Sequence, residues 1–154
     1  MQMNDSQCIA APKEKVWAAL NDAEVLRRCI PGCQQLDMSS PTDMTAVVVI
    51  KIGPMKANFK GKVTLSDLDP PNQCRISGEG SGGVAGFAKG GAWVRLEATP
   101  ENETILHYEV ESQIGGKIAQ LGSRLIDSTA KKLAGEFFAK FVAVVAEDLR
   151  AEGK

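Results

Sequence analysis

The sequence at residues 117–150 reads KIAQLGSRLIDSTAKKLAGEFFAKFVAVVAEDLR, and it decides the fold. Apolar residues recur there every three or four positions, as they do on one face of an α-helix. These residues are Ile118, Leu121, Leu125, Leu133, Phe137, Phe141 and Val145, with Thr129 filling the one gap. A second apolar stripe, which includes Ile126 and Ala130, runs beside the first. The spacing predicts one long helix over residues 117–150 whose wide apolar face is buried.

Almost everything before this helix has the pattern of β-strands. Apolar and polar residues alternate in runs that are separated by turn-forming segments such as Asp69-Pro70-Pro71-Asn72. The predicted strands cover residues 7–10, 34–40, 45–52, 55–68, 73–80, 88–99 and 104–114. Short connections favour antiparallel neighbours. Pro12 and Asp22 mark two short helices, over residues 12–21 and 23–28. The predicted fold class is α+β, with a curved antiparallel sheet of seven strands around the long C-terminal helix.

The strand positions that would face this helix are apolar, and many of them are small. Ala46, Ala57, Gly61, Gly78 and Ala92 all fall on this side of the alternation. Because a helix laid against such small side chains need not fill the space, we expect an apolar cavity between helix and sheet. We expect its lining to include Phe59, Phe87, Tyr108, Leu121, Leu125 and Phe137.

Length and composition predict a single domain over residues 1–154. The chain has 154 residues, of which 44% are apolar, and this is enough for one buried core. The net charge of −1 gives no electrostatic reason to expect a nucleic-acid partner. There is no apolar run as long as a membrane span, and the N-terminus lacks the pattern of a signal peptide. We therefore expect a cytoplasmic protein whose four cysteines are free thiols.

Two short motifs resemble functional sites, but their surroundings argue against that interpretation. Residues 78–83, GEGSGG, match the dinucleotide pattern G-x-G-x-x-G, yet a glycine-rich loop follows where the motif needs a helix. We expect a hairpin with Phe87 at its tip, and whether it acts as a lid stays open. Cys29 and Cys33 have three residues between them and no second pair of ligands, so a structural turn is favoured over metal or redox chemistry. We expect neither a metal site nor a cofactor.

Catalytic groups are hard to place in this sequence. His107 is the only histidine, and it falls on the solvent-facing side of its strand. Tyr108 would point into the cavity without an acid–base partner, so we predict no catalytic residues. The outer face carries Lys56, Lys60 and Lys62, for which a solvated surface is the default interpretation. Docking on an acidic protein or an anionic membrane is the alternative.

Four segments of the chain are similar to a known family. They read APKEKVWAALND at residues 11–22, CIPGC at 29–33, GKV at 61–63 and GGKIAQLGSRLI at 115–126. Together they resemble the carbon monoxide dehydrogenase CoxG family, within the START-like SRPBCC superfamily. The resemblance implies a helix-grip fold with a hydrophobic cavity. It also implies a non-catalytic accessory role beside a molybdenum hydroxylase of the carbon monoxide dehydrogenase type, placing that enzyme at the membrane or linking it to the quinone pool.

The leading hypothesis is a non-enzymatic module that binds a quinone or a lipid in its cavity. One alternative is an assembly or maturation factor that docks on the dehydrogenase through Lys56, Lys60 and Lys62. Another is a cyclase-like enzyme of the superfamily that uses Tyr108. We further expect peripheral contact with the inner face of the cell membrane. The outward positions of Val47, Val49 and Trp93 leave room for a homodimer.

Overall fold

A computed structural model describes residues 2–152, with side chains described through Glu147. The strands are β1 Gln2–Ile9, β2 Cys33–Met38, β3 Asp43–Ile52, β4 Met55–Asp69, β5 Gln73–Ser81, β6 Phe87–Ala98 and β7 Thr104–Gly115. The α-helices are α1 Lys13–Leu20, α2 Ala23–Cys29 and α3 Ser123–Glu152, and the 3₁₀ helices are η1 Gly83–Ala85 and η2 Lys117–Leu121.

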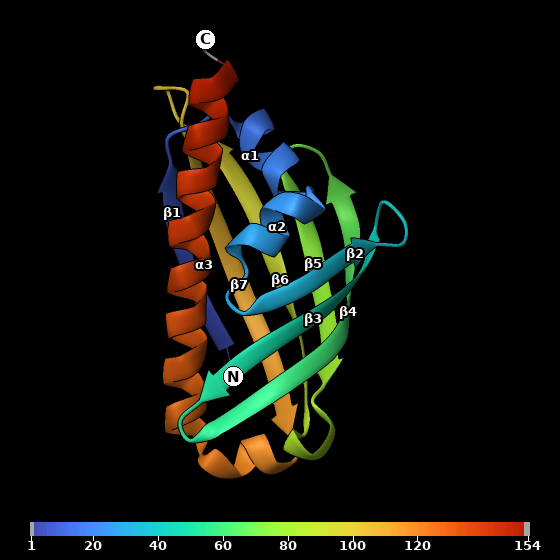
Figure 1. The fold of residues 1–154 in the computed structure, drawn as a ribbon. Helices are drawn as coiled ribbons and strands as arrows, with labels where there is room; N and C mark the ends of the chain where they lie inside the picture. The colour runs from blue at the N-terminus through green and yellow to red at the C-terminus, as the bar shows by residue number, and fades with distance from the viewer. Residues whose placement is uncertain (1, 153–154) are drawn as a thin grey trace.

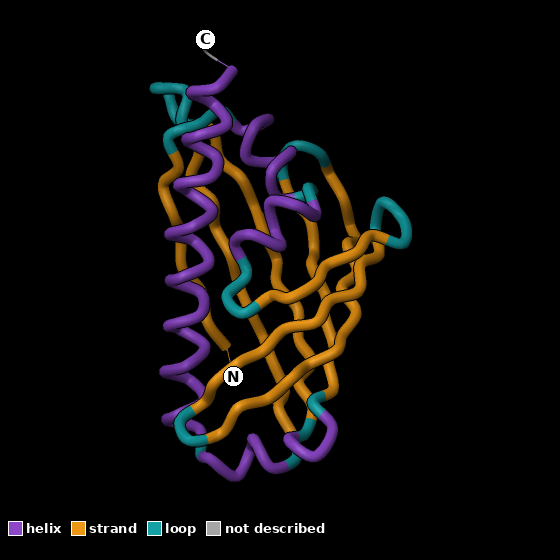
Figure 2. The backbone as a smooth tube through the Cα atoms, in the orientation of Figure 1, coloured by secondary structure: helices purple, strands orange, loops and turns teal. Residues whose placement is uncertain are grey.

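The strands form one antiparallel sheet in the order β1-β7-β6-β5-β4-β3-β2. From β2 to β7 each strand pairs with the next in sequence, whereas β1 pairs with the distant β7. The sheet curves beside α3, and α1 and α2 lie next to the C-terminal half of that helix (Figure 1, Figure 2). The expected α+β fold, with seven antiparallel strands, two short N-terminal helices and a long C-terminal helix, is confirmed.

The two short helices follow from their capping residues. The Asp22 carboxylate accepts hydrogen bonds from the backbone N–H groups of Glu24 at 2.9 Å and Val25 at 3.4 Å, which starts α2 as expected. Pro12 differs from the prediction, because its ψ of 154° places it in extended backbone just before α1 rather than in its first turn. At the other end of α2, Ile30 is extended ahead of Pro31, as steric contact with a proline ring requires.

The prediction of one unbroken helix over residues 117–150 is wrong at its start. Residues 117–121 form the separate 3₁₀ helix η2, and α3 begins only at Ser123. Gly122 lies between them with φ of +96°, a backbone conformation that cannot continue a right-handed helix. The apolar spacing continues across this break because Ile118 is buried beneath η2, so periodicity alone could not reveal it.

Six strands lie within two residues of their predicted bounds, and β1 is the exception. It begins at Gln2 rather than at residue 7, and it pairs with β7 from Gln2–Glu111 to Ile9–Thr104. Its first residues, QMNDSQ, are mostly polar and exposed, so they have no alternation to detect. Backbone pairing with β7, rather than burial of side chains, makes this segment a strand.

Buried side chains are concentrated at the two ends of α3. At the C-terminal end, Phe138, Phe141 and Val145 pack with residues of α1, β6 and β7. At the N-terminal end, Ile52, Phe59, Ala85 and Ile118 share a second cluster. A third cluster lies under α2 and contains Leu26, Leu36, Met44 and Leu65. No helix among the described residues has the length and apolarity needed to cross a membrane.

Candidate functional site

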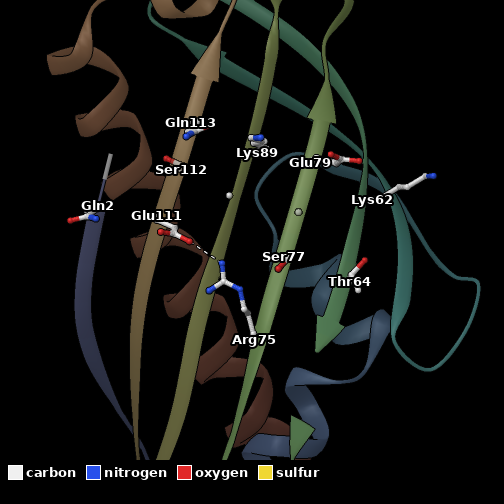
Figure 3. Close-up of a pocket in the computed structure, with 12 residues that line it drawn as sticks. Gln2, Lys62, Thr64, Arg75, Ser77, Glu79, Lys89, Glu111, Ser112 and Gln113 are labelled. Atoms are coloured by element: carbon white, nitrogen blue, oxygen red, sulfur yellow. Dashed lines mark hydrogen bonds and ion pairs between the residues drawn. The ribbon is translucent and has the colours of Figure 1, made fainter. Parts of the chain in front are cut away.

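A cavity of about 490 Å³ lies between the first half of α3 and the inner face of the sheet. Its wall is almost entirely carbon and includes Ile50, Phe59, Ile76 and Val110 from the sheet. Lys62, Glu79, Lys89 and Glu111 contribute to the wall as well. Figure 3 shows these four on β4 to β7 with the residues that line a pocket on the opposite, outer face. The cavity therefore offers apolar contact with few polar partners.

The space is open because the inner face of the sheet lacks side chains at its centre. Gly61 pairs with Gly80 across β4 and β5, and Gly78 pairs with Gly90 across β5 and β6. Alternation places all four on the side that faces α3, where Ala46, Ala88 and Ala92 surround them. Four glycines in adjacent pairs leave a layer that no side chain fills, which produces the cavity.

The four glycines are not equivalent. A Cβ atom added at Gly61 would lie 2.5 Å from the carbonyl oxygen of Glu79, and one at Gly90 would lie 2.4 Å from that of Glu111. Neighbouring strands come too close there for any side chain. At Gly78 and Gly80 the nearest atoms would be 3.6 Å away, which is ordinary van der Waals contact. The glycines at 78 and 80 are therefore not required by the backbone, and their effect is to leave the cavity open.

Helix α3 faces this gap with one stripe of side chains and fills the core with another segment. Ile126, Thr129, Ala130 and Leu133 line the cavity at helical spacing. The Thr129 hydroxyl donates a hydrogen bond to the carbonyl oxygen of Leu125 at 2.8 Å. Since its one proton is used, this hydroxyl can only accept a bond from a ligand.

One of the six residues predicted to line the cavity, Phe59, lies in its wall. The Tyr108 ring instead stacks on Phe138 with centroids 4.8 Å apart, and Phe137 stacks on Phe141 at 5.7 Å. Both rings therefore belong to the packed end of the core. Burial raises the pKa of the Tyr108 phenol.

The other three predicted residues lie near η1 and η2. Leu121 and Leu125 pack against the cluster that contains Ile118. Phe87 begins β6 and is 49% exposed, with its ring over Gly115. The expectation that Phe87 forms the hairpin tip is wrong, because Gly83–Ala85 form it as η1.

Sequence reasoning missed several wall residues because it chose large side chains. A large ring on an inward position fills space, whereas a cavity persists where inward residues are small. The signal was available in the second stripe of α3, with Ile126 and Ala130, and in the inward Gly78 and Ala92.

The outer face of the sheet carries a polar pocket of about 670 Å³. Arg75 crosses it, with Nη2 2.9 Å from Oε1 of Glu111 (Figure 3). The guanidinium carbon also lies 5.2 Å from the centre of the Trp93 ring, a cation–π distance. Both charges of the pair are therefore partnered within the protein.

Three exposed lysines that were predicted to form a docking surface, Lys56, Lys60 and Lys62, alternate along β4. Alternation puts them on the outer face together. Lys56 pairs directly with Lys51 of β3, while Lys62 pairs with Glu79 of β5. The row is therefore most strongly basic at the turn between β3 and β4.

The thiols and the histidine have ordinary structural surroundings. His107 is on the outer face as expected, with Nε2 2.9 Å from Oε1 of Glu97. Burial raises the pKa of Cys29 and Cys33, and it raises that of Cys74 to about 11. These three thiols are therefore protonated near neutral pH. Among the described residues, no three potential metal ligands come together.

Comparisons with known proteins agree on the fold. The family model for the carbon monoxide dehydrogenase protein CoxG matches residues 6–146. A conserved protein from Geobacillus kaustophilus is 28% identical, with 96% of each chain covered and a TM-score of 0.89. A START superfamily protein from Mycobacterium smegmatis is 12% identical, with 95% of this chain and 97% of that chain covered and a TM-score of 0.73.

The Zhui aromatase/cyclase from Streptomyces sp. R1128 is also similar in fold. It is 11% identical, with 99% of this chain and 98% of that chain covered and a TM-score of 0.68. At such low identity this similarity, like that to the Mycobacterium smegmatis protein, shows the fold alone. No curated protein sequence matches this chain.

Proposed function

Because the chain belongs to the carbon monoxide dehydrogenase CoxG family, we propose that it carries a hydrophobic ligand beside a molybdenum hydroxylase of the carbon monoxide dehydrogenase type. The family implies association with carbon monoxide dehydrogenase, in an accessory role that is not known to be catalytic. In this proposal the protein performs no reaction of its own, and its cavity is the working part.

The observation that carries this proposal is the cavity opposite the glycine layer. Its volume of about 490 Å³ is within the roughly 300–1,000 Å³ typical of small-molecule sites. An apolar wall favours a ligand that is itself mostly hydrocarbon, such as a quinone or a lipid. Phe59 and Ala130 would contact this ligand from opposite sides, and Thr129 could accept one hydrogen bond.

The remaining predicted ligand residues have supporting positions in this proposal. Tyr108 and Phe137 would stabilise the closed end of the core against which the cavity ends. Leu121 and Leu125 would stabilise the opposite end. The cyclase alternative is weaker, because Tyr108 is stacked in the core rather than in the cavity wall.

The test is native mass spectrometry of the protein purified gently from its own lysate, followed by solvent extraction of anything released. We expect one quinone or lipid molecule per chain. The Ala130→Leu variant should lose it, because the larger side chain occupies the cavity. Ala139→Leu is the matched control, since Ala139 is exposed on the same helix. A ligand retained equally by both variants would exclude the cavity as the binding site.

A second candidate function, an assembly or maturation factor, depends on the exposed lysines of β4. Lys60 and Lys62 lie on the outer face, away from the cavity, so a partner could bind them without affecting ligand uptake. The Lys60→Glu/Lys62→Glu variant should then fail to capture the dehydrogenase while keeping its ligand. Capture at the wild-type level would exclude this docking face.

A further inference from the structure

We propose that the end of the molecule formed by the β3–β4 turn, η1, η2 and the start of α3 binds the surface of an anionic phospholipid bilayer. We call the residues 50–57, 82–88 and 114–126 the basic end. The inference rests on charge and exposure at this end, and it goes beyond the ligand carriage proposed above.

The three segments of the basic end are joined by direct contacts. A Cβ atom at Gly53 would lie 2.8 Å from Leu125, so the β3–β4 turn touches α3. One at Gly86 would lie 3.0 Å from the Cα atom of Gly116, so η1 and η2 are adjacent. Figure 2 shows the two short helices beside the β3–β4 turn at one end of the molecule. Residues far apart in sequence thus present one surface.

Charge is strongly segregated to this surface. The basic end contains Lys51, Lys56, Lys117 and Arg124, all exposed, and no aspartate or glutamate. Its charge of +4, in a chain whose net charge is −1, leaves −5 for all other residues. The first carboxylate after these segments is Asp127. An anionic surface would therefore be attracted to this end and repelled by the remainder.

Two features of the fold concentrate positive potential here. Lys51 and Lys56 are direct cross-strand partners, an arrangement in which like charges repel unless an anion lies near. Helix α3 starts at this end, and its first turn has no acidic residue to balance the positive end of its dipole.

The same surface exposes apolar side chains on a narrow loop. Val84 at the tip of η1 is 86% exposed, and Phe87 beside it is 49% exposed. A protruding apolar tip ringed by lysines suits the boundary between headgroups and acyl chains, where apolar groups insert and cations meet phosphates. A flat acidic protein would leave this tip without a pocket. Ile52, Ile118 and Ile126 connect the basic end to the cavity, so a ligand could pass between bilayer and cavity.

The test is co-sedimentation of the full chain with vesicles. Wild type should bind vesicles made of two parts phosphatidylcholine to one part phosphatidylglycerol, should not bind pure phosphatidylcholine, and should dissociate as salt is raised. Lys117→Glu/Arg124→Glu should weaken this binding about 25-fold or more, from about fivefold for each basic charge removed near the surface. Val84→Ser should weaken it further without affecting folding, because that side chain is exposed.

The matched control is Lys132→Glu/Lys140→Glu, which changes net charge equally at exposed positions of α3 outside the basic end. It should bind like wild type. Equal binding to both vesicle types, equal weakening in the control, or tighter binding to polyglutamate than to the anionic vesicles would overturn the proposal. Ala130→Leu should bind vesicles normally, so failure of ligand carriage and failure of membrane binding give different results.

Discussion

At the scale of single residues, Cys74 shows how burial decides chemistry. Its side chain is 1% exposed in the core cluster, and loss of hydration raises the thiol pKa to about 11. Cys8 is equally a free cysteine, but it lies exposed on the edge strand β1. Two thiols of one chain therefore differ in both access and ionisation, although the sequence presents them alike.

We expect iodoacetamide at about pH 8, near the pKa of an unperturbed thiol, to modify Cys8 much faster than Cys74. Peptide mass mapping after timed quenching would measure both rates in one sample. Adding urea should make the two rates similar, because unfolding exposes Cys74. Equal rates in the native protein would contradict the buried position of Cys74.

At the scale of elements, the sheet combines two kinds of glycine. Gly61 and Gly90 let strands approach closely, whereas Gly78 and Gly80 keep the inner face open. The second kind stabilises nothing in the folded state and leaves the unfolded chain more flexible. Sheet stability is therefore lower than this backbone would allow, and the cavity is the structural result.

Gly80→Ala should stabilise the protein by about 0.4–1 kcal/mol, because alanine restricts the unfolded chain and its Cβ atom fits. Gly61→Ala should destabilise it by about 1–3 kcal/mol, because its Cβ atom would displace the backbone of β5. Urea unfolding with an unchanged m-value would measure both. If the two substitutions had effects of the same sign, the division of the glycines would be wrong.

The elements were more predictable from sequence than the site. Alternation and turn residues predicted the strands β2 to β7, because both are local properties. The break at Gly122 was missed because apolar spacing continues across it, and β1 was shortened because pairing rather than burial defines it. The cavity itself was predicted correctly from small inward residues, but its wall was not. Whether Tyr108 faces open space or Phe138 depends on packing across the whole sheet, which no local pattern contains.

At the scale of the whole molecule, the charges are separated far more than the net value suggests. A charge of −1 hides an end with +4 and a remainder with −5. The molecule should therefore orient in an electric field or near a charged surface even though its overall charge is small.

We expect the wild-type protein to bind a sulfonate cation exchanger at neutral pH and low salt, despite a sequence pI of about 5.9. Lys117→Glu/Arg124→Glu should pass through unretained, whereas Lys132→Glu/Lys140→Glu, with the same net charge, should still be retained. The salt concentration at elution measures the difference. Identical elution of the two variants would mean that net charge alone controls retention.

The pairing of β1 with β7 has a consequence for synthesis on the ribosome. Ile9 pairs with Thr104, so β1 leaves the ribosome long before its partner has been made. Strands β2 to β7 can pair in the order in which they emerge, while β1 must wait until most of the chain is complete. During that interval Met3 and Ile9 have no sheet to cover them. Polar residues between them, which weakened the strand signal, also reduce the risk that the waiting segment associates with another nascent chain.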